Sequence, residues 1–421
     1  MSRSGPRGTV LVIGGGISGI TAAVEASEAG CEVVLVEKQA FLGGRVARSH
    51  QYFPKLCPPQ CGLEINLRRI RTNPLIRALT LAEVREIRGG PEHYHVTIEQ
   101  HPRRVNARCT ACGACVDACP VTRPDDFNLG WTTTKAIYLP YDMAYPQQFV
   151  IDAGVCPGAS CGKCVPACPF DAIDLAMAPE TVTLDVQAVI VTTGWDPYDA
   201  ARLGVLGFGA SPDVITNVMM ERLAAPAGPT GGKIVRPSDR KPVASVAFVQ
   251  CAGSRDENHL RHCSGVCCLG SLKQARYVRE QYPDAEIYVF YIDIRAPGRL
   301  EDFYAASQAD AKLHLIKGKV AKVTGDAATG RLTVEAEDTL SGAPVRQAVD
   351  LVVLATGIVP SDTSGIQTDG GLAKDAHGFL TREQAQAGVL VAGCAARPTD
   401  VATCVRDATG AVMKALAFCA E

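Results

Sequence analysis

Cysteine dominates the reactive chemistry that this sequence can support, with 18 cysteines among 421 residues. The first dense run reads Cys109-x2-Cys112-x2-Cys115-x3-Cys119-Pro120. Loops of two residues let successive thiolates point at three corners of one iron-sulfur cube, and the fourth thiolate, just before proline, reaches a neighbouring cluster. The spacing therefore predicts ligands of 4Fe-4S clusters.

A second run repeats the ferredoxin pattern from Cys156 to Pro169, with two extra residues in its first gap. Because the fourth thiolate of each run crosses to the other cluster, the predicted ligand sets mix the two runs. One cluster is assigned Cys109, Cys112, Cys115 and Cys168, and its neighbour Cys156, Cys161, Cys164 and Cys119. Structural zinc is the alternative, since all-cysteine zinc sites also use short gaps. The proline after each last cysteine favours the ferredoxin pattern.

A third set of cysteines follows the strand-like run Val243 to Val249. Its members are Cys251, Cys263, Cys267 and Cys268. A relative that binds NAD(P)H would carry a second glycine fingerprint at this point, and none is present. We therefore predict a third cluster here. The alternative is four buried or loop cysteines without metal, because adjacent cysteines are awkward ligands; His262 is expected on a surface loop.

The remaining cysteines have weaker signals. Cys57 and Cys61 suit a redox pair, a surface that faces a partner, or buried thiols. We expect the others to be packing residues: Cys31, Cys394, Cys404 and Cys419. The start of the chain, residues 1–8, leaves no space for the apolar core of a signal peptide, so we expect a cytosolic protein with reduced thiols and no disulfide framework.

The elements that must position this chemistry begin with a βαβ unit at residues 9–40. A strand ends at Ile13, a helix runs to about Ala29, and a second strand precedes Glu37. Between the first strand and the helix lies Gly14-x-Gly16-x-x-Gly19, which allows a tight turn and a close approach to a pyrophosphate at the helix N-terminus. Glu37 would bond the ribose hydroxyls. The unit predicts a dinucleotide site.

Four further features favour FAD over NAD. Phe41-Leu-Gly43-Gly44-Arg45 resembles the GG motif of two-dinucleotide-binding flavoproteins, with Arg45 as charge partner of the pyrophosphate. Thr192-Thr-Gly194 and Ala355-Thr-Gly357 resemble the paired strand ends of that class, and residues 388–393 resemble its C-terminal flavin motif, with Cys394 where Asp is usual. A βαβ unit without flavin is the alternative. The predicted flavin-site residues are Gly14, Gly16, Ser18, Gly19, Glu37, Lys38, Gly43, Gly44, Arg45, Thr193, Gly194, Thr356, Gly357, Gly393, Cys394, Asp400 and Val401.

The predicted fold class is α/β, a two-dinucleotide-binding, thioredoxin-reductase-like flavoprotein with an inserted double-cluster ferredoxin domain. The FAD-binding domain is assigned residues 1–100, 179–240 and 351–421. The ferredoxin-like insertion takes 101–178. A degenerate NAD(P)H-type domain with the third cluster takes 241–350.

Charge and hydropathy exclude several classes of partner. Lysine plus arginine number 42 against 44 aspartates plus glutamates, so a formal charge of -2 gives no case for nucleic acid or an anionic membrane surface. No apolar run reaches the ~18 residues that span a bilayer. We expect any membrane contact to come through a partner protein.

Taken together, these features resemble the A subunit of heterodisulfide reductase and its relatives, over residues 1–421. The resemblance rests on Gly43-Gly-Arg-Val-Ala47, Lys135-Ala-Ile-Tyr-Leu-Pro140, Gln250-Cys-x-Gly-Ser-Arg255, Cys263-x3-Cys-Cys268 and Ala392-Gly-Cys394. The segment Tyr52 to Ile65 is most similar to the A subunit of the quinone-interacting membrane-bound oxidoreductase complex of sulfate reducers.

The resemblance implies an electron-transfer role beside two other subunits, one with a second flavin and iron-sulfur clusters and one in the membrane with haem. FAD and the clusters would link menaquinol oxidation to adenylylsulfate (APS) reductase, at the inner face of the cytoplasmic membrane. Electron bifurcation or confurcation at the flavin is a hypothesis, because several one-electron centres flank it. The alternatives are the A subunit of sulfur-oxidation or methanogen enzymes, an NAD(P)H-dependent iron-sulfur flavoprotein such as the small subunit of glutamate synthase, and a conduit whose FAD is only a scaffold.

Overall fold

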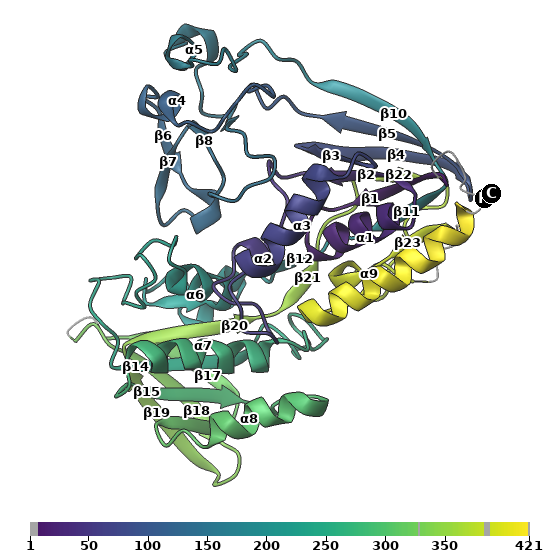
Figure 1. Ribbon diagram of the computed structural model, residues 1–421. Coiled ribbons are helices and arrows are strands. Elements are labelled where there is room, and N and C mark those ends of the chain that lie inside the picture. Colours follow the sequence, from purple (N-terminus) through teal and green to yellow (C-terminus); the bar gives the residue numbers. More distant parts are fainter. Residues whose placement is uncertain (1–6, 327–328, 383–387, 420–421) are drawn as a thin grey trace.

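The chain folds into two α/β domains and a small insertion, seen in a computed structural model that describes residues 7–326, 329–382 and 388–419 (Figure 1). A five-stranded parallel sheet, in the order β23-β11-β1-β2-β3, forms the centre of the first domain. Its strands are β1 (Thr9–Ile13), β2 (Glu32–Glu37), β3 (Ile76–Thr80), β11 (Ala188–Val191) and β23 (Val389–Val391). They are runs of Val, Ile and Leu because both faces of the sheet are covered.

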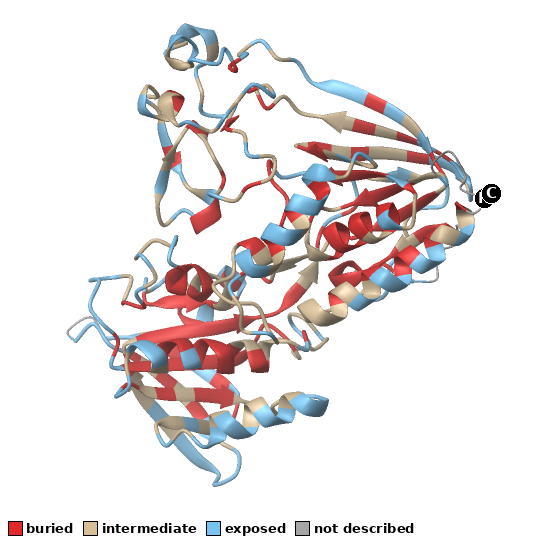
Figure 2. Cartoon of the chain, in the orientation of Figure 1, coloured by how far each residue is buried: buried red, intermediate tan, exposed pale blue. Residues whose placement is uncertain are grey.

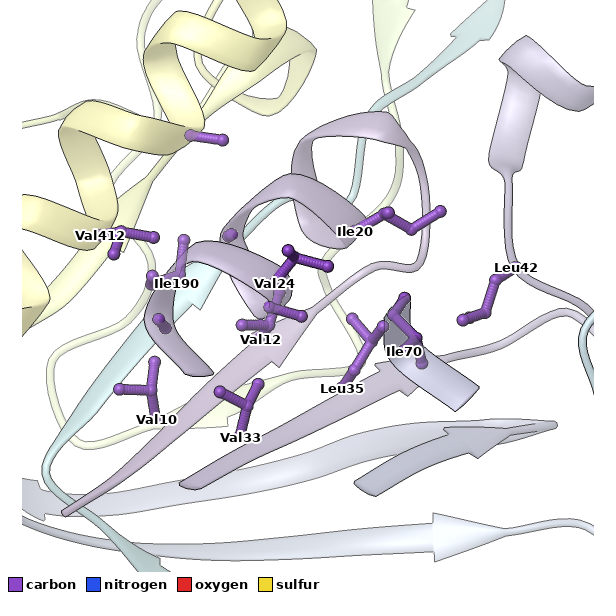
Figure 3. Close-up of a cluster of buried hydrophobic side chains, with 14 of the residues drawn as sticks. Val10, Val12, Ile20, Val24, Val33, Leu35, Leu42, Ile70, Ile190 and Val412 are labelled. Carbon is purple, nitrogen blue, oxygen red and sulfur yellow. The ribbon is translucent and has the colours of Figure 1, made fainter. Parts of the chain in front are cut away.

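Helices cover one face of this sheet and a second sheet covers the other. The helices are α1 (Ile17–Glu28), α3 (Gln60–Thr72) and α9 (Val401–Ala415). Figure 3 shows Val10, Val12, Leu35 and Ile190 of the sheet packed beneath α1 and α9. The covering antiparallel sheet has the order β10-β5-β4-β22, from β4 (Ala82–Gly90), β5 (His93–Gln100), β10 (Glu180–Val186) and β22 (Gln367–Thr368). The apolar core therefore lies on both sides of β1.

The second domain repeats this layered plan with a parallel sheet in the order β13-β20-β14-β15-β16. Its strands are β13 (Val214–Thr216), β14 (Ser245–Ala252), β15 (Glu286–Tyr291), β16 (Leu313–Lys317) and β20 (Leu351–Thr356). One face packs against α6 (Asn217–Ala224), α7 (Cys267–Gln281) and α8 (Glu301–Gln308). The other packs against the antiparallel β17 (Val320–Gly325), β18 (Leu332–Asp338) and β19 (Ala343–Val349). Figure 2 shows the central strands buried.

The second domain is larger than the predicted 241–350. Strand β20, expected in the FAD-binding domain, pairs with β14, and β13 and α6, placed before the boundary, pack in the same sheet and core. A run of buried apolar residues satisfies either sheet equally well, so its sequence does not say which one it joins. The two domains are linked by the antiparallel ribbon of β12 (Trp195–Pro197) and β21 (Ile358–Pro360).

The insertion leaves the first domain after β5 and returns through β10, which pairs with β5. Its elements are short: β6 (Thr122–Pro124), β7 (Thr133–Lys135), β8 (Ile137–Tyr138), β9 (Val150–Ile151), α4 (Ala114–Asp117) and α5 (Cys164–Ala167). A small apolar core, which includes Val105, Phe149 and Ile173, holds them together. Within the described ranges, every helix is too short or too polar to traverse a lipid bilayer.

Arg222 on α6 joins the three parts of the chain. It is 3% exposed, and its Nε and Nη2 atoms donate to Asn128 Oδ1 of the insertion at 3.0 and 2.9 Å. Its Nη1 donates to the carbonyl of Arg48 in the first domain, and its guanidinium lies over the ring of Phe127. Burial lowers the pKa of Arg222 to about 10. This residue fixes the insertion relative to both domains.

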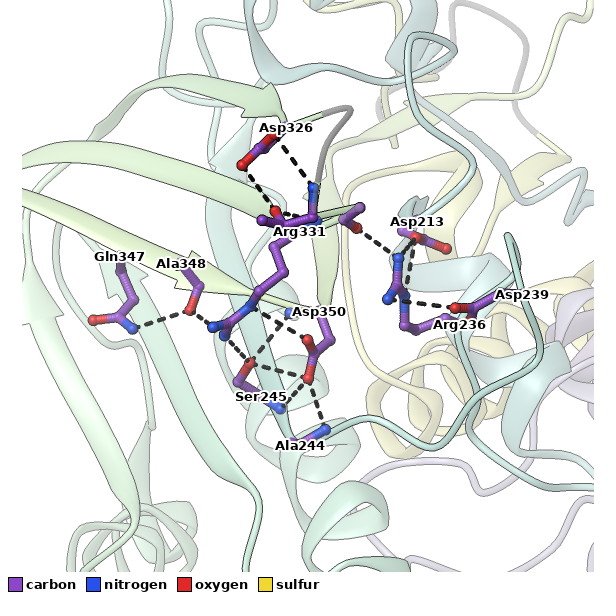
Figure 4. Close-up of polar contacts among 12 residues, drawn as sticks. Asp213, Arg236, Asp239, Ala244, Ser245, Asp326, Arg331, Gln347, Ala348 and Asp350 are labelled. Carbon is purple, nitrogen blue, oxygen red and sulfur yellow. Dashed lines mark hydrogen bonds and ion pairs between the residues drawn. The ribbon is translucent and has the colours of Figure 1, made fainter.

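Asp213 anchors the linker of the second domain (Figure 4). It is 2% exposed and accepts from Arg236 Nη2 at 3.0 Å and from Ser238 Oγ at 2.7 Å. We expect Asp213→Ala to lower the free energy of unfolding by about 3–5 kcal/mol, because it leaves Arg236 without its buried partner. Asp239→Ala is the matched control, since Asp239 pairs with the same arginine from the partly exposed rim and should cost under about 1 kcal/mol. Urea denaturation followed by circular dichroism measures both, and equal losses would contradict the expectation.

Candidate flavin and iron-sulfur sites

Two connected cavities open at the carboxyl edge of the first parallel sheet, where a doubly wound fold binds its ligand. Their open volumes are about 1030 and 1230 Å³. The first begins at the glycine turn, and the second extends between the two domains. They share the wall residues Arg45, Val46, Arg48, Trp195, Thr399 and Val401. The two spaces therefore form one continuous site.

The glycine turn after β1 is shaped to receive a pyrophosphate. Gly14 has a φ of +108°, and a Cβ there would lie 2.4 Å from the carbonyl of Thr192. A Cβ on Gly19 would lie 1.7 Å from the carbonyl oxygen of Gly14, so α1 packs too closely for any side chain. A Cβ on Gly16, which lines the cavity, would meet open space. The ligand can thus approach the backbone at Gly16 and the N-terminus of α1.

Glu37 ends β2 in the wall of the same cavity, beside Lys38. It is 7% exposed, and its carboxylate accepts from the amides of Gly15 and Gln39 at 2.6 and 2.7 Å. Burial raises the pKa of Glu37, while these two amides oppose the shift. The amides fix the carboxylate, and its remaining lone pairs suit ribose hydroxyls.

Arg45 on α2 (Gly44–Ala47) lines both parts of the cavity. Its Nε donates to the carbonyl of Trp195 at 3.0 Å, and its guanidinium pairs with Asp196. The predicted charge partner of the pyrophosphate is therefore also tied to β12. Trp195 and Arg48 are wall residues that no motif in the sequence indicated.

The C-terminal wall is built at the start of α9. Asp400 caps this helix, accepting from the amide of Thr403 at 2.7 Å, and Val401 lines both parts of the cavity. Thr193, Gly194, Ser18 and Cys394 line the glycine-turn part. Cys404, predicted to be a packing residue, lines it too, because one turn of helix brings it to the same wall.

Three predicted flavin residues lie elsewhere among the described residues. Thr356 accepts from Cys267 Sγ through its carbonyl at 3.7 Å, and a Cβ on Gly357 would lie 2.3 Å from Ser254 Oγ. Both therefore belong to the surroundings of the third cysteine set. Gly393 lies behind the cavity wall, where a Cβ would meet Ser18 Oγ at 2.2 Å. The first two corrections follow from β20 joining the second sheet.

A further cavity of about 1090 Å³ continues from Glu37 and Lys38. Residues 361–366 form its far wall. Thr363 in this loop is 5% exposed, and its buried Oγ1 has no hydrogen-bond partner among the described residues. The loop carries no recognisable motif, so sequence reasoning missed it. Its position beyond the ribose-binding carboxylate suits the adenosine end of FAD.

The ferredoxin-like insertion brings together the two predicted thiolate sets. One small hollow is lined by Cys109, Cys112, Cys115 and Cys168. A second is lined by Cys119, Cys156, Cys161 and Cys164. Each run thus contributes its last cysteine to the hollow of the other.

Short electrostatic ranges support the same grouping. Burial, followed by Cys109 and Cys168, raises the pKa of Cys115 to about 12. Burial likewise raises the pKa of Cys164, with Cys156 and Cys119 among its neighbours. In the described ranges, no three His, Cys, Asp or Glu side chains converge on one metal-ion position, so the thiols surround each hollow at wider spacing.

The third cysteine set forms where β14 meets α7. Cys251 sits at a β-bulge with a φ of +56°, and Cys267 and Cys268 begin α7. Burial, followed by the nearby Cys268, raises the pKa of Cys251 to about 11, and Cys263 is also close. His262, expected on a surface loop, is half-buried, and its Nε2 lies 2.9 Å from the carbonyl of Ile358. The four cysteines are gathered as predicted.

Cys267 also lines the interdomain part of the flavin cavity. Its opposite walls carry Arg45 and Val401, which border the glycine-turn part. The third cysteine set therefore lies beside the predicted flavin. This placement depends on the packing of two domains and has no local sequence signal.

The remaining cysteines divide by exposure. Cys31 and Cys419 are buried in the first-domain core, as expected of packing residues. Cys57 is half-buried in the loop before α3, and Cys61 is exposed in the first turn of that helix. Both lie close enough to Tyr52 to add to the burial that raises its pKa.

Known families match the parts described above. A family described as FAD dependent oxidoreductase matches residues 9–95, and 4Fe-4S binding domains match residues 103–121 and 155–171. Thioredoxin reductase from T. acidophilum has a TM-score of 0.52 at 14% identity, covering 97% of this chain and 98% of its own. The enzyme from Lactococcus lactis has 0.51 at 13%, covering 98% and 99%. These likenesses confirm the predicted fold class, and the chain is an FAD-dependent iron-sulfur oxidoreductase subunit.

Sequence relatives narrow this class. The A subunit of the ferredoxin/F420H2-dependent CoB-CoM heterodisulfide reductase of Methanosarcina acetivorans is 38% identical over 97% of this chain and 52% of its own length. The iron-sulfur A subunit of the CoB-CoM heterodisulfide reductase of Methanocaldococcus jannaschii is 38% identical over 95% and 63%. The chain belongs to the family of heterodisulfide reductase A subunits, over the half to two thirds of these relatives that it spans.

Proposed function

We propose that this chain relays electrons between partner proteins as the FAD and iron-sulfur subunit of a heterodisulfide-reductase-like complex. The observation that carries the proposal is the continuous cavity from the glycine turn at Gly16 to the thiol of Cys267. A ligand in this cavity would contact a dinucleotide cradle at one end and the third thiolate set at the other. The shared wall thus supports direct electron exchange between flavin and cluster.

The residues of the cavity fit FAD. The open space at Gly16 and the N-terminus of α1 accept a pyrophosphate, and the buried carboxylate of Glu37 accepts ribose hydroxyls. When bound, FAD takes up electrons in pairs and passes them on singly. The apolar part of the wall, including Val46, Trp195 and Val401, would keep water away from the ring.

The second domain retains the position of an NAD(P)H site with different chemistry. A nicotinamide cofactor needs a glycine turn between β14 and α7 to hold its phosphates. This connection instead carries Cys251 at its start and Cys267 at the first position of α7. A cluster here would receive electrons from the flavin where a relative would deliver hydride, so we propose a third 4Fe-4S cluster.

The relatives favour a heterodisulfide reductase role over a role in sulfate respiration. Their names give ferredoxin and F420H2, or hydrogen, as electron donors of those proteins. For this chain we propose other subunits of one cytoplasmic complex as donor and acceptor. The finer assignment to menaquinol oxidation and APS reductase rests on the segment Tyr52 to Ile65 alone, and bifurcation rests on the flanking one-electron centres.

An anaerobic reduction assay tests the relay. We expect stoichiometric NADPH to leave the flavin absorption band of the purified holoprotein unchanged, because the second domain has no phosphate cradle. A reduced viologen, which donates single electrons, should bleach both the flavin and the clusters. Rapid bleaching by NADPH alone would contradict the proposal and support an NADPH-dependent enzyme. Clusters that turn over while the flavin stays oxidised would also contradict it.

A further inference from the structure

Two thiols face each other in the wall of the flavin cavity. Cys394 follows β23, Cys404 lies in the second turn of α9, and their Sγ atoms are 3.8 Å apart. Each residue is 6% exposed, and each lines the glycine-turn part of the cavity. A disulfide needs an Sγ-Sγ distance of about 2.05 Å, so modest side-chain rotations would close the bond.

The surroundings make the two thiols unequal. Cys394 donates through Sγ to the carbonyl of Thr399 at 3.4 Å and interacts with Cys404. The hydrogen bond between the two thiols raises the pKa of Cys394 and lowers that of Cys404, and Ser18 lowers the latter further. Burial opposes ionisation at both positions. One member is thus favoured as thiolate and the other keeps its proton, the asymmetry that thiol-disulfide chemistry uses.

We propose that Cys394 and Cys404 form a redox-active dithiol-disulfide pair that exchanges two electrons with flavin bound in this cavity. Oxidation breaks two S-H bonds and forms one S-S bond. The two protons and two electrons released pass to oxidised flavin, which becomes fully reduced, and the reverse reaction restores the dithiol. The inference rests on the proposed flavin function, and it adds a two-electron store beside the one-electron clusters.

The chain contains its own control pair. Cys31 and Cys419 are both buried, at 0% and 1% exposure, and their thiols also interact through a hydrogen bond. They lie in the helix-side core of the first domain and are not among the described residues that line the flavin cavity. Simple air oxidation of close thiols would affect both pairs, whereas flavin-coupled oxidation would affect only the cavity pair.

Mass spectrometry of the holoprotein reads the two states directly. Trypsin should leave Cys394 and Cys404 on one peptide ending at Arg406, since it does not cut between Arg397 and Pro398. Protein with oxidised or viologen-reduced flavin is quenched in acid, alkylated and digested under anaerobic conditions. We expect the oxidised state to give a peptide lighter by two hydrogens and without alkyl groups. The reduced state should give the same peptide with two alkyl groups, and Cys404→Ser should give one alkyl group in both states.

Three results separate the inference from the proposed function. A pair that carries two alkyl groups in both flavin states overturns the inference and leaves the relay standing, provided that FAD and iron content are normal. Equal oxidation of Cys31 and Cys419 also overturns it. Reduction of the cavity disulfide by viologen in holoprotein, but not in FAD-stripped protein, supports it. Failure of the purified chain to bind FAD would refute the proposed function and the inference together.

Discussion

Alanine at Cys168 is expected to remove the cluster held by the other cysteine run. Cys168 belongs in sequence with Cys156, yet it lines the hollow that contains Cys109 and Cys115. Its Sγ accepts from the amide of Ala172 at 3.4 Å, which fixes the sulfur at this hollow. Loss of one thiolate opens a corner of the cube, so iron content should fall from about twelve to about eight atoms per chain.

Double variants show which cluster is lost. Cys112→Ala with Cys168→Ala removes two ligands of one cluster, so it should lose about four irons, no more than either single variant. Cys161→Ala with Cys168→Ala removes ligands of both clusters and should lose about eight. The reverse pattern would show that each run holds its own cluster and would contradict the crossed assignment. Electron paramagnetic resonance of the reduced variants provides an independent count.

Gly16→Ala is expected to weaken FAD binding without unfolding the chain. The φ of Gly16 is -76°, which alanine adopts freely, and its new methyl group would project into the cavity. Crowding of this kind costs about 1–3 kcal/mol, so the Kd for FAD should rise about 5- to 150-fold. Titration of FAD-stripped protein, followed by flavin fluorescence, measures the change.

Gly19→Ala is the contrasting variant. Its Cβ would lie 1.7 Å from the carbonyl oxygen of Gly14, so α1 must shift and the fold itself should be destabilised. We therefore expect a lower melting temperature for Gly19→Ala and an unchanged one for the FAD-free form of Gly16→Ala. Wild-type FAD affinity in Gly16→Ala would show that the dinucleotide does not approach the backbone at this turn.

The features predictable from the sequence are those that short segments encode completely. The turn from Gly14 to Gly19 lies between one strand and one helix, and the ferredoxin-like spacing fixes which thiolates can share a cube. Both hollows of the insertion contain the predicted thiols because a loop of two residues leaves little conformational choice.

Other parts of the site depend on how distant segments pack. Leu351 to Thr356 reads as a buried strand for either sheet, and its pairing with β14 moved Thr356 and Gly357 away from the flavin. Cys404 reads as a helix core residue until α9 is placed against the cavity. The contacts of Arg222 with Asn128 and Arg48 join segments more than 90 positions apart, which no local pattern reveals.

Iron, acid-labile sulfide and flavin content of the anaerobically purified chain tests the central claim most directly. We expect about twelve irons, about twelve sulfides and one FAD per chain, because three four-thiolate sets each hold one cluster beside one flavin. Zinc in place of iron in the paired cysteine runs, or a pyridine nucleotide bound between β14 and α7, would contradict the electron-relay account.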